Sequence, residues 1–144
     1  ARTPWREGLE SAGANQMRHA RALLESRPFL SRIPDQSLLV SPPGTGADHV
    51  QATRDAFGSY AFVYLPKGTP VTINLRRLSG QRVRAAWFDP RTGASRAIGE
   101  FATGVAHEFT APSAGPGNDW VLVLDDADRG YALPGRKPAA EPTK

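Results

Sequence analysis

The sequence predicts an all-β fold, an antiparallel β-sandwich of seven or eight short strands, preceded by an N-terminal helical segment. Residues 36–126 alternate apolar and polar side chains with the period of a strand. Glycine, proline, aspartate and asparagine separate these runs, and no helical pattern interrupts them. Residues 1–33 instead repeat their apolar side chains at helical spacing.

The helical segment carries a narrow apolar stripe. Met17, Ala20 and Leu24 recur at i, i+3 and i+7. Pro28 ends the helix, because a residue that precedes proline avoids the helical region. A helix of this length is marginal in water by itself, so the stripe must find a partner or fray.

The connector after the helix, residues 27–39, is expected to be fixed against the sandwich. Four of its apolar side chains can enter the core: Phe29, Ile33, Leu38 and Leu39. In a chain of this size, one hydrophobic core can hold both the connector and the strands.

The expected strands follow one another with turn residues between them. Residues 59–66 are apolar on both faces, which is typical of a central strand. Residues 71–77 alternate cleanly, as a half-buried strand does. All the expected strands are residues 37–40, 59–66, 71–77, 83–88, 94–101, 106–111 and 119–124.

The chain divides into three zones: the helical segment 1–33, a sandwich over 34–128 and a loose tail over 129–144. Its 144 residues contain no cysteine, which excludes disulfides and thiolate metal sites. No apolar run is long enough to span a bilayer, and the first residues lack the apolar core of a signal peptide. The net charge of +4 permits weak attraction to acidic partners without specifying one.

Several motifs occur in an order that resembles a known family. They are SRPF and IPDQSLL within 26–39, GSYAFVYLPKGTPVTINL at 58–75, WFDPRTG at 87–93 and DWVLVL at 119–124. The chain resembles the C-terminal module of apiosidase-like glycoside hydrolases, which is known as the "putative collagen-binding domain of a collagenase". The resemblance implies a preceding TIM-type catalytic barrel, whose closing helix the 1–33 segment resembles. It carries no catalytic carboxylate onto this chain.

WFDPRTG is the best local candidate for a site. The structural interpretation, which the sequence favours, is a strand that ends in a tight turn, with Asp89 capping the turn and Gly93 supplying a positive φ. The functional interpretation is a ligand-binding edge, where an aromatic ring stacks on a sugar or a proline. Its residues would be Trp87, Phe88, Asp89 and Arg91. Neighbours on a strand point to opposite faces, so one of the two aromatic rings belongs to the core.

Other candidate sites are weaker. His19, His49 and His107 lie far apart in the sequence, so a zinc site is not expected. Residues 125–130 begin like a calcium loop but lack its glutamate, and a solvated turn is favoured over a calcium site. Glu100 and Glu108 are each expected to face solvent outside any cleft, which argues against a glycosidase pair.

Arginine-rich strands favour a solvated basic face over a nucleic-acid site, because the aromatic residues fall mainly on the opposite face. Arg82 and Arg84 share one side of a strand, and Arg76 is expected to join them across a hairpin. Nucleic-acid binding normally adds aromatic side chains on the basic face.

We therefore expect a non-catalytic accessory domain of a secreted or periplasmic glycoside hydrolase, with the catalytic barrel as its partner. No cofactor, metal, nucleic acid or membrane is expected to bind. The alternative is an independent binding module for collagen or a polysaccharide. An accessory domain should expose an apolar patch toward the barrel, whereas a binding module should expose aromatic residues on a sheet face or loop rim.

Overall fold

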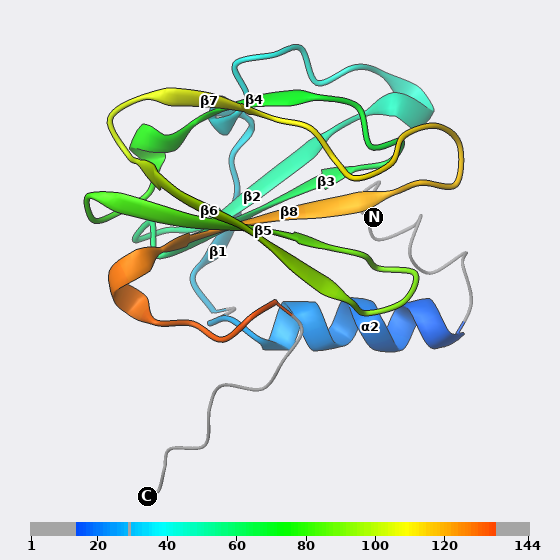
Figure 1. The fold of residues 1–144 in the computed structure, drawn as a ribbon, viewed down its shortest axis with the longest axis horizontal. Helices are drawn as coiled ribbons and strands as arrows, with labels where there is room; N and C mark the ends of the chain where they lie inside the picture. Colours follow the sequence, from blue (N-terminus) through cyan, green and yellow to red (C-terminus); the bar gives the residue numbers. More distant parts are fainter. Residues whose placement is uncertain (1–13, 29, 135–144) are drawn as a thin grey trace, which may run out of the picture.

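The protein is described by a computed structural model that covers residues 14–28 and 30–134, with only the backbone of residues 14–17. Three layers are stacked (Figure 1): a two-stranded sheet, a six-stranded sheet and helix α2 (Ala14–Glu25). Every strand pair is antiparallel. The all-β prediction is confirmed.

The large sheet has the strand order β1-β2-β3-β8-β5-β6, and β4 pairs with β7 in the small sheet. The strands are β1 (Arg32–Pro34), β2 (Gln51–Asp55), β3 (Tyr60–Leu65), β4 (Val71–Asn74), β5 (Arg82–Phe88), β6 (Ser95–Ala102), β7 (Ala106–Phe109) and β8 (Trp120–Asp126). Strands β1 and β2 were not expected from the alternation. Because β1 spans three residues, it is too short to show a period.

The strand expected at residues 37–40 does not form. Gln36–Leu38 are a 3-10 turn instead, and Leu39 makes only an isolated bridge to Ile73. The side chain of Asp35 accepts a hydrogen bond from the backbone N–H of Ser37. This local bond competes with the ladder, as short polar side chains often do.

The main core lies between the two sheets. Strand β3 is central, and all six of its residues are buried. Ala61, Val63 and Leu65 point toward the small sheet, where Val71 and Ile73 face them. The pattern of residues 59–66 thus predicted both the position and the burial of this strand.

A second core lies on the outer face of the large sheet, under α2. Tyr60, Phe62 and Tyr64 belong to it, together with Ala20 and Leu23 of the helix. The expected helical stripe ended at Leu24, which is only partly buried, whereas Leu23 is fully buried. Ala20 is buried as expected. The buried stripe is therefore shifted toward Leu23 by less than the roughly 100° that separates adjacent helical residues. The side chain of Met17 lies outside the described residues.

The connector is only partly packed as expected. Leu38 is buried and Leu39 packs against the main core, which confirms the prediction for both. The prediction is wrong for Ile33, which is 38% exposed because β1 is the edge strand of its sheet. Phe29 lies outside the described residues.

The segment after β8 differs from the expected loose tail as far as it is described. The hydroxyl of Tyr131 donates a hydrogen bond to Ser59 Oγ at 3.0 Å, and its ring packs on the outer core. Pro134 is buried. Residues 135–144 lie outside the described residues.

Candidate functional site at the end of helix α2

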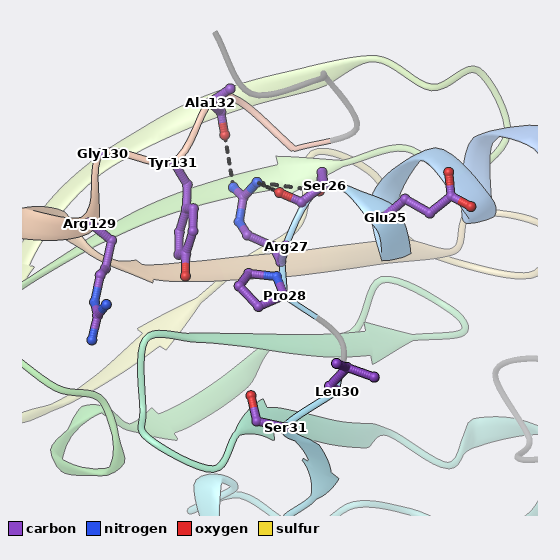
Figure 2. Close-up of a pocket in the computed structure, with 10 residues that line it drawn as sticks. All are labelled: Glu25, Ser26, Arg27, Pro28, Leu30, Ser31, Arg129, Gly130, Tyr131 and Ala132. Atoms are coloured by element: carbon purple, nitrogen blue, oxygen red, sulfur yellow. Dashed lines mark hydrogen bonds between the residues drawn. The ribbon is translucent and has the colours of Figure 1, made fainter. Parts of the chain in front are cut away.

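A hollow of about 750 Å³ opens where the chain leaves α2 (Figure 2). One wall comes from the end of the helix and the connector: Glu25, Ser26, Arg27, Pro28, Leu30 and Ser31. The other wall comes from Arg129, Gly130, Tyr131 and Ala132, which follow β8. Two segments about a hundred residues apart in sequence therefore meet here.

Arg27 lies between these two walls, and none of its side chain is exposed. Its Nε donates to Asp125 Oδ1 at 2.9 Å, and its Nη2 donates to Asp125 Oδ2 at 2.8 Å. Such a two-pronged pair fixes the orientation of both side chains, which a lysine could not do. The pair joins the end of α2 to the end of β8.

The remaining donors of Arg27 are also used. Nη2 donates to the carbonyl of Ala132 at 2.9 Å, and Nη1 donates to the carbonyl of Ser26 at 3.1 Å. The guanidinium carbon lies 4.7 Å from the centre of the Tyr131 ring, within the range of a cation–π contact. One buried side chain thus holds the helix end, the last strand and the C-terminal segment together.

Burial dominates the electrostatics of this pair. It raises the pKa of Asp125 above the ordinary value, and the Arg27 guanidinium offsets only part of that rise. Removing either partner would leave a buried group without its counterpart.

A second polar cluster surrounds Asp55, at the end of β2. Ser59 donates to Asp55 Oδ2 through both its hydroxyl and its backbone N–H, and the Ser31 hydroxyl donates to Oδ1. Burial alone would raise the pKa of Asp55, but these bonds outweigh it and lower that pKa. Through Ser31, this cluster ties the connector to β2.

The WFDPRTG motif forms the turn that was expected of it. The backbone N–H of Gly93 donates to the carbonyl of Asp89 at 2.7 Å, and Gly93 has a φ of +81°. Trp87 and Phe88 are both buried, on opposite faces of β5: Trp87 between the sheets and Phe88 under α2. Neither ring presents a face to solvent. Ligand binding at Asp89 and Arg91 stays a prediction.

Arg91 is partly buried in a polar cluster at this turn. Its Nε lies 2.9 Å from Asp89 Oδ1 and 3.5 Å from Asp119 Oδ1, and its guanidinium carbon lies 5.2 Å from the Trp120 ring centre. Burial raises the pKa of Asp119, while the Tyr64 hydroxyl and Arg91 offset part of the rise. The structure thus brings Asp89 and Arg91 together and separates Trp87 and Phe88 from them.

The other sequence candidates do not converge. Glu100 on β6 and Glu108 on β7 belong to different sheets, and both are exposed. Arg76 lies in a 3-10 turn after β4 of the small sheet and donates to the carbonyl of Gly104, whereas Arg82 and Arg84 lie on β5 of the large sheet. Within the described residues, no group of three histidine or carboxylate side chains could hold a metal ion.

Sequence reasoning missed Arg27 and Asp125 as a pair. One signal was available: Asp125 directly follows the apolar run 120–124 of β8, where a strand buried on both faces has no room for an unpaired charge. That signal predicts a partner for Asp125, but nothing local identifies the partner as Arg27.

Fold and site together define a small antiparallel β-sandwich module with a helix packed and ion-paired against its outer face. The family described as "Putative collagen-binding domain of a collagenase" matches residues 33–125, and the chain belongs to this family. No curated protein sequence matches the chain.

Two solved structures are similar to the chain. One is a glycoside hydrolase family 5 protein from Bacteroides vulgatus, with a TM-score of 0.77 and 31% identity over 85% of this chain. The other is described as "Glycoside hydrolase", with a TM-score of 0.78 and 34% identity over 92% of this chain. The chain spans only 26% and 29% of the length of these two proteins.

Proposed function

We propose that this chain is a non-catalytic accessory module, at the C-terminal end of a glycoside hydrolase, that packs on the catalytic barrel and supports it. One observation carries the proposal. Most of this chain matches two glycoside hydrolases, yet it accounts for less than a third of either. The unmatched remainder of such a protein has the room for a catalytic barrel, which typically needs about 250 residues.

The geometry at the end of α2 supports the same role. Helix α2 resembles the element that leads out of the barrel, so its attachment to the sandwich would determine how the two domains sit. Leu23 buries the helix against the sheet, and Arg27 pairs with Asp125 beyond its last turn. Domains joined only by a linker move freely by default. A helix packed in this way instead limits their relative motion.

Glu100 and Glu108, the carboxylates considered as a glycosidase pair, lie on different sheets and are both exposed. Glycoside hydrolases place two carboxyl groups about 5–10 Å apart on either side of the scissile bond. Asp89 and Asp119 both contact the Nε of Arg91. The Arg91 side chain therefore occupies the space between the two carboxylates, where a substrate would have to lie. The proposed role is therefore structural rather than catalytic.

A secreted or periplasmic location is part of the proposal, because the barrel of such a protein would act on extracellular polysaccharide. No helix of the described residues is long and apolar enough to cross a membrane.

The family's description favours a second function, binding of collagen or a polysaccharide. Modules of that kind present aromatic rings to the ligand, whereas Trp87, Phe88 and Trp120 are buried here. Phe57 is the exposed large aromatic side chain of the described residues. We therefore expect collagen or polysaccharide affinity to be about millimolar or weaker.

The test exchanges modules in the relative described as "Glycoside hydrolase". Its matched region is replaced by this 144-residue chain, and thermal unfolding and hydrolysis are compared with the relative lacking that region. We expect the chimera to regain the melting temperature that truncation lowers. The isolated chain should show only background hydrolysis of polysaccharides and collagen. A chimera no more stable than the truncated enzyme would contradict the proposal.

A further inference from the structure

We propose that Leu30 and Phe57 form the surface on which the catalytic barrel docks. This inference rests on the proposed function and adds the contact residues to it. Leu30 is 93% exposed and Phe57 is 76% exposed, the two highest values among the large apolar side chains of the described residues. Exposed apolar side chains of this size, gathered at one place, mark interaction surfaces.

The two side chains lie at the same end of one strand pair. Arg32 of β1 pairs with Asp55 of β2, and the backbone N–H of Ala56 donates to the carbonyl of Ser31 at 2.7 Å. Leu30 and Phe57 are the next residues on these two segments. Residues far apart in sequence thus contribute to one apolar patch, the Leu30–Phe57 patch.

The patch borders the hollow described above. Leu30 lines the hollow together with Pro28, Tyr131 and Ala132. A raised apolar patch beside a recess can both insert into a partner and receive a side chain from it. Apolar side chains on an outer helix of a barrel would match this surface, because both sides of the contact would bury apolar area.

Position favours the barrel over other occupants. The patch is a few residues beyond the end of α2, the element through which the barrel would be joined. Attachment through the same chain gives the barrel a high effective concentration, so a small contact suffices. A stable dimer needs about 800 Å² from each partner, far more than two side chains supply. A sugar or collagen surface would meet one largely exposed aromatic ring, that of Phe57, beside the half-buried ring of Tyr131 in the hollow.

The experiment uses the chimera described under the proposed function, with Leu30→Asp and Phe57→Asp introduced together. The matched control is Val40→Asp with Val105→Asp, because these apolar residues are also exposed, at 59% and 54%, and lie outside the patch. We expect the unchanged chimera and the control to melt in one transition. The patch variant should melt in two, with the barrel transition lowered by roughly 2–4 °C or more.

The same patch substitutions in the isolated 144-residue chain should leave its urea unfolding unchanged, which shows that the variant folds. An unchanged chimera that already melts in two transitions, with no gain in barrel stability, contradicts the proposed function. A single transition that survives the patch substitutions leaves the proposed function standing and overturns this inference.

Two further outcomes would also overturn it. The isolated chain could be a dimer by light scattering that the patch substitutions dissociate. It could also bind a Gly-Pro-Hyp triple-helical peptide with micromolar affinity that Phe57→Asp abolishes. A monomer without such affinity agrees with docking of the barrel.

Discussion

Arg27 and Asp125 lie 98 residues apart in sequence and form a two-pronged ion pair with N–O distances of 2.9 and 2.8 Å. The side chains of Arg27 and Asp125 are 0% and 7% exposed. The pair connects the second residue after helix α2 with the strand at the centre of the large sheet. The pair therefore fixes the end of the helix to the sandwich.

Arg27→Ala should lower the free energy of unfolding by about 3–5 kcal/mol, because it leaves Asp125 buried without a counterion. Urea unfolding monitored by circular dichroism measures the change. The exposed pair of Arg82 and Glu100 provides the control, and Arg82→Ala should cost less than about 1 kcal/mol. Equal small losses in both variants would mean that the buried pair does not hold the helix end.

Leu23→Ala should destabilise the chain by about 2–5 kcal/mol, since Leu23 is fully buried between α2 and the sheet. Leu24→Ala removes the same atoms from a partly buried position and should cost clearly less. Hydrogen exchange across residues 18–25 should accelerate more in the Leu23 variant. A larger effect at Leu24 would show that the helix packs through its other face.

Gly93→Ala should cost more stability than Gly117→Ala. Both glycines have a φ of +81°, so both substitutions introduce the same backbone strain. A Cβ at Gly93 would lie 2.5 Å from His19 Nδ1, whereas one at Gly117 meets nothing within 4 Å. The difference, measured by urea unfolding, should disappear when His19→Ala is also present. A difference that persists would locate the strain in the turn rather than in its contact with the helix.

Asp55 and Asp119 should respond to pH in opposite directions. Hydroxyl and backbone donors lower the pKa of Asp55 below its ordinary 3.8 against the effect of burial, so its stabilisation is present above that pH. The stabilisation is lost as the pH falls through the folded-state pKa. Burial raises the pKa of Asp119, so folding binds an extra proton and stability decreases as the pH rises from 3.8 through the raised value.

Urea unfolding from pH 3 to pH 6 tests this, with Asp55→Asn and Asp119→Asn each compared with the unchanged chain. The advantage of the unchanged chain over Asp55→Asn should grow as the pH rises. Its advantage over Asp119→Asn should shrink. If the curve of each variant ran parallel to that of the unchanged chain, neither carboxyl would change its pKa on folding.

Local patterns were sufficient for most of the sandwich. Residues 60–65 and 120–124 are continuous apolar runs, and each lies in a central, fully buried strand of the large sheet. The turn chemistry of WFDPRTG was also correct. Alternation and turn residues act over a few neighbours, so their signal survives without knowledge of the rest of the chain.

The burial of the candidate site residues could not be predicted from local patterns. Trp87 and Phe88 were candidates for a ligand edge, with one of the two rings expected in the core, but two cores exist, one on each face of β5, and each core buries one ring. The sequence cannot show that a helix from residues 14–25 covers the outer face of the sheet. Once it does, a strand buried on both sides leaves no aromatic ring free for a ligand.

The sequence by itself determined the all-β class, the antiparallel strands and the family to which the chain belongs. Only the tertiary structure decided that Leu23 is buried more fully than Leu24, that Arg27 pairs with Asp125 and that Leu30 lies near Phe57. The reason is physical. Periodicity reflects contacts between near neighbours, whereas a buried ion pair or an exposed patch arises when distant segments meet, and their meeting depends on the packing of the whole chain.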